Sequence, residues 1–136
     1  MSTTFNWPVR IYWEDTDAGG IVFYANYLKF FERSRTEWLR AKGVAQQQIK
    51  DSVGGMFVVS DVQLRYLKSA RLDDELSVTT TLTEAGRASM TVFQQAWLTG
   101  TAEPVLLCEA TIRIGWVDAI SRKPARIPQV ILDTLT

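Results

Sequence analysis

A single long helical pattern, followed mainly by strand-like segments, constrains the fold of this chain more than any other feature of its 136 residues. The pattern begins at Asn26, a predicted helix N-cap, and ends before Gly43. Apolar and small residues recur on one face at helical spacing; they are Tyr27, Phe30, Phe31, Ser34, Trp38 and Ala41. Because aromatic side chains at this spacing normally bury against a sheet, we expect this face to form core and not a cofactor site.

Strand-like patterns lie on both sides of this helix. Before it, Val9, Ile11 and Trp13 alternate with more polar residues, which is the two-residue period of a half-buried strand. After it come four segments rich in Val, Thr, Leu, Ile and aromatic residues, at 56–66, 75–84, 89–98 and 105–117. One helix followed by successive hairpins predicts an α+β fold in a single domain, 1–136, with a short last helix at 128–135.

Three carboxylates within four positions, Glu14, Asp15 and Asp17, stand between the first predicted strand and the helix. Gly19 and Gly20 follow directly, and glycine lets the main chain approach a ligand without a Cβ in the way. On composition alone such a segment is more often a solvated turn, because Asp and Gly are primarily turn-forming residues. The alternative is a reaction site, in which a carboxylate acts as nucleophile or base and the helix start offers N–H donors.

Five stretches of the sequence carry a resemblance to a known family; they are 7–10 (WPVR), 14–20 (EDTDAGG), 31–37 (FERSRTE), 70–74 (ARLDD) and 123–128 (KPARIP). Together they resemble the 4-hydroxybenzoyl-CoA thioesterase family, and within it the YbgC-type acyl-CoA thioesterases associated with the Tol-Pal system. The resemblance implies a hotdog fold, in which a five-stranded antiparallel sheet wraps around one long central helix. It also implies that subunits pair, as a homodimer or as a homotetramer built from two dimers, and hydrolyse acyl-CoA thioesters at the subunit interface.

The same resemblance suggests roles for two residues of the acidic segment and the helix start. The family's catalytic carboxylate is the second Asp of Asp-x-Asp, which is Asp17 here, and both a nucleophilic and a general-base route stay open. The backbone N–H of Tyr24 is the candidate donor to the developing oxyanion, because the helix dipole favours negative charge there. YbgC-type members commonly carry His at this position, whereas the 4-hydroxybenzoyl-CoA enzymes carry Tyr. The Tyr24 side chain is equally well interpreted as an apolar wall or as an orienting group.

Substrate-binding residues are expected around the acidic segment and in basic stretches of the second half. Gly19 and Gly20 leave room for a bulky acyl thioester beside Asp17. We expect Arg or Lys side chains near the mouth of the site to bind the phosphates of CoA. The candidates are Arg87, Arg122, Lys123 and Arg126. For each of these four residues, a solvated surface charge is the competing interpretation.

Composition excludes several other classes of protein. The chain has no histidine and one cysteine, which removes Ser-His-Asp, Cys-His and the usual zinc sites, so a hydrolase must work through carboxylates. No nucleotide-cofactor fingerprint is present, and we expect neither a cofactor nor a metal. Lys plus Arg equals Asp plus Glu at 15 each, which does not favour nucleic acid. Neither a secretory signal nor an apolar run of about 18 residues occurs, so the expected location is cytoplasmic, with no integral membrane segment.

Two other functions are consistent with parts of this pattern. A hotdog module could hold acyl-CoA or acyl carrier protein without turnover, because a fold does not fix a function. A carboxylate-pair hydrolase such as a glycosidase would use Asp15 and Asp17, but alternating positions project in opposite directions from an extended chain. Chain length and aromatic or aliphatic preference of the acyl group stay open at this stage.

Overall fold

The computed structural model describes residues 3–136, and residues 1 and 2 of the predicted domain lie outside the described residues. The elements in chain order are β1 (Phe5–Arg10), a 3₁₀ turn (Trp13–Asp15), α1 (Asn26–Ala41), α2 (Gln46–Val53), β2 (Gly55–Tyr66), β3 (Glu75–Ala85), β4 (Ser89–Leu98), β5 (Val105–Asp118) and α3 (Gln129–Leu135). All four strands predicted after the long helix are present, and each of their ends lies within one residue of the expected position.

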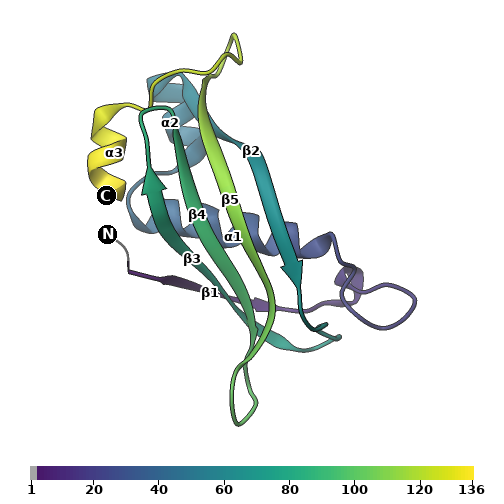
Figure 1. Ribbon diagram of the computed structural model, residues 1–136. Coiled ribbons are helices and arrows are strands. Elements are labelled where there is room, and N and C mark those ends of the chain that lie inside the picture. The colour runs from purple at the N-terminus through teal and green to yellow at the C-terminus, as the bar shows by residue number, and fades with distance from the viewer. Residues whose placement is uncertain (1–2) are drawn as a thin grey trace.

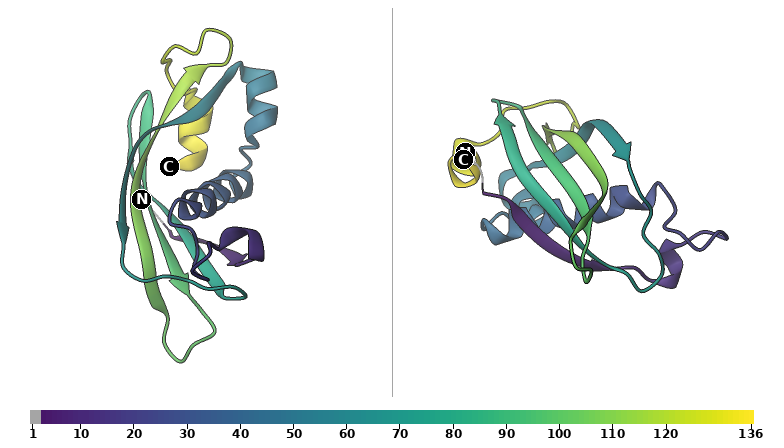
Figure 2. Two further views of the ribbon diagram at one scale, coloured as in Figure 1. Left: turned by 90° about the vertical axis from the view of Figure 1, so that its right-hand side faces the viewer. Right: turned by 60° about the horizontal axis from the view of Figure 1, so that its bottom comes forward.

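The strands form one antiparallel sheet in the order β1-β3-β4-β5-β2, and α1 crosses it (Figure 1). Seen from the side, the sheet curves, and α1 and α2 lie on the same side of it (Figure 2). The predicted hotdog fold, a five-stranded antiparallel sheet around one long helix, is confirmed. Across residues 3–136, no helix has the length and apolar character that a bilayer crossing requires.

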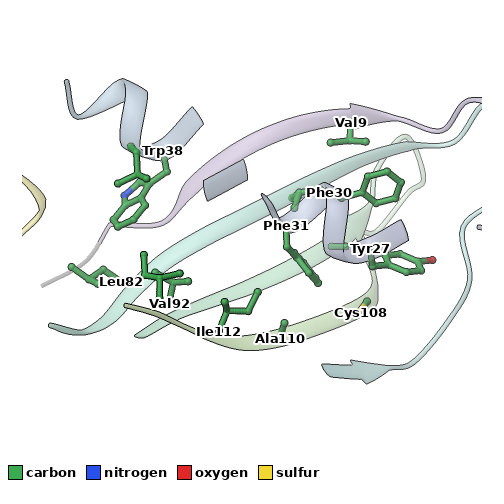
Figure 3. Packing of buried hydrophobic residues seen from close by; sticks show 14 of the residues in the cluster. Val9, Tyr27, Phe30, Phe31, Trp38, Leu82, Val92, Cys108, Ala110 and Ile112 are labelled. Carbon is green, nitrogen blue, oxygen red and sulfur yellow. The ribbon is translucent and has the colours of Figure 1, made fainter. Parts of the chain in front are cut away.

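The predicted apolar face of α1 forms the core between helix and sheet (Figure 3). Phe30 and Phe31 are fully buried, and truncating such a side chain to Ala typically costs about 3–5 kcal/mol. Ser34 is also fully buried, and its hydroxyl donates to the backbone carbonyl of Val78 on β3 at 2.9 Å. A small polar residue in this stripe therefore lets the helix approach the sheet without leaving a buried hydroxyl unpaired.

The first predicted strand ends earlier than its alternating pattern suggests. β1 stops at Arg10, and Trp13, expected on the buried face, lies in the 3₁₀ turn with 80% of its surface exposed. The reason is local, because an Asp15 carboxylate oxygen accepts a hydrogen bond from the backbone N–H of Tyr12 at 2.8 Å. That contact turns the chain before Trp13 can continue the strand, so the prediction for Trp13 was wrong.

The start of α1 also differs from the sequence-based prediction. Ala25 occupies the N-cap position without a side-chain cap, and Asn26 is the first helical residue. The Asn26 amide instead donates to the other Asp15 carboxylate oxygen at 2.9 Å, so its side chain ties the helix to the preceding loop. At the opposite end of the helix, Ala41 is exposed and does not belong to the core.

β2 forms one edge of the sheet and pairs with β5 alone among the described strands. Along this edge Val58, Val59 and Val62 are each between 37% and 46% exposed. An unpaired edge with apolar side chains is a template for another strand unless it is protected. This edge is therefore well suited to pairing with a second chain.

Candidate active site

Asp15 is the structural carboxylate of the loop between β1 and α1. It is only 4% exposed, and its two side-chain oxygens accept from the Tyr12 N–H and from the Asn26 amide. Its backbone carbonyl accepts from the N–H of Phe23 at 2.9 Å. With both oxygens occupied and buried, Asp15 holds the two ends of the loop together and has no oxygen free for chemistry.

Asp17 has the opposite surroundings. It is exposed, and one carboxylate oxygen (Oδ1) accepts from the Gly19 N–H at 2.8 Å. Its backbone is held on both sides, since its N–H donates to Ile21 O at 2.9 Å and its carbonyl accepts from Gly20 N at 3.0 Å. Gly20 has φ +80°, a conformation that glycine adopts without strain. Among residues 3–136 the second oxygen, Oδ2, has no hydrogen-bond partner, so a fixed carboxylate presents one open oxygen.

The open carboxylate lines a shallow cavity of about 260 Å³ between the loop, the start of α1 and the end of β2. The lining residues are Asp17, Ile21, Val22, Tyr24, Tyr27, Tyr66, Leu67, Lys68 and Ser69. Apolar and aromatic groups make up most of this wall, and a carboxylate lies at its rim. A concave apolar surface with a few polar groups is the usual form of a small-molecule site.

Tyr24, just before α1, lines the same cavity, and its backbone N–H differs from those of its neighbours. The N–H of Val22 and Phe23 are taken by Ala70 O and Asp15 O, whereas within the described chain the N–H of Tyr24 has no backbone partner. A free N–H at the positive end of a helix dipole stabilises negative charge on a bound oxygen. The Tyr24 side chain is 65% exposed and packs beside Phe23, with 4.9 Å between ring centroids.

Two further tyrosines connect the end of β2 to this helix start. The Tyr66 hydroxyl donates to the Tyr24 backbone carbonyl at 2.9 Å, and the Tyr27 hydroxyl accepts from the Ala70 N–H at 3.1 Å. Burial raises the pKa of both phenols, so both remain protonated at neutral pH. Sequence reasoning missed Tyr66, because it stands 42 residues from its partner and no local pattern joins them.

The only cysteine of the chain lies under these tyrosines and is not a nucleophile. Cys108 on β5 is fully buried, and burial raises the pKa of its thiol to about 12. A thiol with that pKa is protonated at neutral pH, and the thiolate is the reactive form. Cys108 therefore belongs to the core, which leaves carboxylates as the reactive groups of this region.

The predicted basic residues gather at another place in the chain. Arg87 lies in the turn between β3 and β4, and its carbonyl accepts from Ile127 N at 2.8 Å, which brings it beside Arg126. Arg122 and Lys123 lie in the turn after β5, and all four basic side chains are exposed. The structure thus brings these four residues to one end of the sheet.

That end is far from the loop between β1 and α1 within a single chain (Figure 1). β2 connects the two places, since Gly55 pairs with Asp118 beside the basic turns and Tyr66 pairs with Cys108 beside the cavity. Eleven residue steps at about 3.3 Å each separate Gly55 from Tyr66, or roughly 36 Å. One chain alone therefore does not join the acidic and basic parts of the predicted site.

A family model described as the thioesterase-like superfamily matches residues 11–135, which is nearly the whole chain. The chain belongs to the thioesterase-like superfamily. The match includes the Asp17 loop, all of α1, and the turns that carry the basic residues. The family resemblance found in the sequence is confirmed.

Similar proteins and solved structures extend over nearly the whole chain. It is 40% identical over 131 residues to the acyl-CoA thioesterase YbgC of Haemophilus influenzae, covering 96% of this chain and 93% of that protein. It is 43% identical over 133 residues to the acyl-CoA thioester hydrolase YbgC of Escherichia coli O157:H7, covering 97% and 96%. A solved structure of a 4-hydroxybenzoyl-CoA thioesterase variant in complex with 4-hydroxybenzoyl-CoA has a TM-score of 0.91 at 17% identity, covering 98% and 99%.

Proposed function

We propose that this thioesterase-superfamily chain hydrolyses acyl-CoA thioesters, with Asp17 as the reacting carboxylate. The main support for the proposal is that a carboxylate and a backbone N–H donor lie at the same cavity. A carboxylate fixed through Gly19, with one open oxygen, lies at the same cavity as the helix start that carries the free Tyr24 N–H. The two YbgC relatives, named for acyl-CoA thioester hydrolysis, support the same substrate class.

Either of two routes uses these groups. As a nucleophile, Asp17 adds to the thioester carbonyl carbon, CoA leaves as a thiolate, and water then hydrolyses the acyl anhydride to the free acid. As a general base, Asp17 takes a proton from water, which adds to the same carbon directly. In both routes the carbonyl oxygen gains negative charge, and the Tyr24 N–H is the proposed donor to it.

The absence of histidine from the sequence is compatible with this chemistry. A thiol has a pKa of about 8.5, so CoA departs as a thiolate far more readily than an amine or an alkoxide departs. A thioester therefore needs no strong general acid for its leaving group. The reaction then mainly requires a group that attacks the carbonyl carbon or activates water, and a donor that stabilises the oxyanion. The carboxylate and the backbone N–H supply these two functions.

The proposed site also needs a second copy of the chain. If two β2 edges pair antiparallel about a two-fold axis, the basic end of one copy lies beside the Asp17 end of the other. This pairing would cover Val58, Val59 and Val62 and bridge the roughly 36 Å between the two parts. We therefore propose a homodimer, which could pair again into a dimer of dimers, with Arg87 and the 122–126 turn facing the CoA phosphates.

A panel of acyl-CoA thioesters of varied chain length tests this function, with CoA release followed for wild type and for Asp17→Asn. We expect turnover by wild type and a loss of about 1,000-fold in kcat for the variant, the usual scale for removing a catalytic base. Glu14→Gln is the matched control, because it neutralises an exposed carboxylate of the same loop, and it should retain most activity. Equal rates for wild type and Asp17→Asn would reject the assignment.

The same panel distinguishes the proposed enzyme from a binding module. If wild type binds acyl-CoA in calorimetry but releases no CoA from any chain length, the chain is a carrier or sensor of thioesters and not a hydrolase. Including acyl carrier protein thioesters compares the two carriers of acyl groups directly. A higher kcat/KM for CoA substrates is expected, because four basic residues are available for the nucleotide.

A further inference from the structure

The hydrogen bond from the Tyr66 hydroxyl to the Tyr24 carbonyl fixes one particular peptide group. That carbonyl belongs to the peptide between Tyr24 and Ala25, whose N–H is the N–H of Ala25. A trans peptide is planar, and its N–H points opposite to its carbonyl. Holding the Tyr24 oxygen at 2.9 Å therefore also sets the direction of the Ala25 N–H.

The neighbouring peptides are held by the helix itself. Phe23 O accepts from Asn26 N at 2.8 Å, which orients the peptide that carries the Tyr24 N–H, and Ala25 O accepts from Leu28 N at 3.1 Å. Between them, the Tyr24 carbonyl has the Tyr66 hydroxyl as its sole partner among the described residues. Tyr66 is thus the side chain that completes the orientation of this helix start.

Tyr66 is itself held in place from several sides. Its ring meets Tyr24 and Tyr27 edge to face, with centroid distances of 6.2 and 5.9 Å. Beyond Tyr66 the chain is anchored to the same region, since Ala70 N donates to the Tyr27 hydroxyl and Ala70 O accepts from Val22 N. Desolvation raises the pKa of the Tyr66 phenol, so its hydroxyl remains a donor at neutral pH.

We propose that Tyr66 is a positioning residue for thioester hydrolysis, whose hydroxyl fixes the Ala25 N–H beside the helix-held Tyr24 N–H, so that both donate to the thioester oxygen. This inference rests on the proposed function. Fixed donors stabilise a developing oxyanion without any rearrangement at the moment of reaction, whereas donors that must first be oriented lose much of that effect. Tyr66 acts through the backbone and does not itself touch the reacting atoms.

Tyr66→Phe tests the inference by removing one hydroxyl and keeping the ring. We expect kcat to fall about 10-fold with KM changed less than two-fold, because the donors act mainly in the transition state. Tyr12→Phe is the control, since it removes a hydroxyl from an exposed tyrosine that lines no part of the cavity, and its kcat should equal that of wild type. An unchanged kcat for Tyr66→Phe, or a rise in KM alone, would overturn the proposal.

Infrared spectroscopy of a bound thioester separates positioning from general stability. With Asp17→Asn as the background, a substrate labelled with ¹³C at the thioester carbonyl should show a C=O band at lower frequency than in water. Adding Tyr66→Phe should move that band back toward its value in water. If the band stays in place while kcat falls, Tyr66 supports the fold and does not aim the donors.

A second measurement removes any dependence on how well Tyr66→Phe folds. A fluorinated tyrosine at position 66 keeps the shape of the side chain and lowers the pKa of its phenol. We expect kcat to fall as the pH rises through that lowered pKa, while wild type shows no such loss. An identical pH profile would reject the positioning role, and an active Asp17→Asn variant would instead reject the proposed function.

Discussion

Asp15 and Asp17 stand two residues apart in the same loop and have opposite surroundings. Asp15 is 4% exposed with both oxygens accepting hydrogen bonds, whereas Asp17 is exposed with one oxygen anchored to Gly19 and the other open. The first carboxylate organises the backbone, and the second is available to a substrate. The two carboxylates are chemically identical, and they have different roles because their hydrogen-bond partners differ.

The largest effect on stability is expected from Asp15→Ala. The substitution leaves the buried Asn26 amide and the Tyr12 N–H without their acceptor, which should cost about 2–4 kcal/mol in the free energy of unfolding. Chemical denaturation measures this value. Asp17→Ala is the control and should cost less than about 1 kcal/mol, because its carboxylate is exposed. Equal losses in the free energy of unfolding for the two variants would contradict a structural role for Asp15 that Asp17 lacks.

Gly20→Ala should have a smaller effect that acts on the backbone alone. At φ +80° an alanine is strained by about 1–2 kcal/mol, and the added Cβ would meet no atom within 4 Å. Gly19→Ala sharpens the comparison, because its Cβ would lie 3.2 Å from the Asp17 oxygen that accepts the Gly19 N–H. We expect Gly19→Ala to lower kcat while changing the free energy of unfolding little. Gly20→Ala should mainly lower the free energy of unfolding, as measured by denaturation. The reverse order would contradict this geometry.

The smallest predicted effect concerns the basic end of the sheet. Arg87→Ala should raise KM for an acyl-CoA about 5-fold, or about 1 kcal/mol, and leave KM unchanged for an acyl-pantetheine that lacks the nucleotide. Arg10→Ala is the control, since its guanidinium belongs to an exposed pair with Glu75 at 2.6 Å. Steady-state kinetics with both substrates measure these KM values. An equal rise in KM for both substrates would count against a contact between Arg87 and the phosphates.

Much of the fold was predictable because it follows from periodic patterns. The segments after the long helix that are rich in β-branched and aromatic residues became β2 to β5 nearly residue for residue, and the aromatic stripe of α1 became the core. The errors lie in the loop that carries the acidic residues. Trp13 and Asn26 were misplaced because the buried Asp15 bends the chain and recruits the Asn26 side chain, and burial of a carboxylate has no local sequence signal.

The candidate site was predictable in its residue types but not in its arrangement. The motif pointed to Asp17 and to the start of α1, which line one cavity. The sequence could not place Tyr66 beside Tyr24, nor reveal that the basic residues lie at the far end of β2. Both facts depend on strand pairing between segments far apart in the chain, which only the folded sheet determines.

A crystal structure of Asp17→Asn with an unhydrolysed acyl-CoA bound tests the central claim most directly. We expect the thioester carbonyl oxygen at about 2.7–3.1 Å from the Tyr24 N, its carbon beside the substituted side chain at position 17, and the nucleotide on basic residues of a second copy. A thioester bound away from both position 17 and the start of α1 would contradict the account.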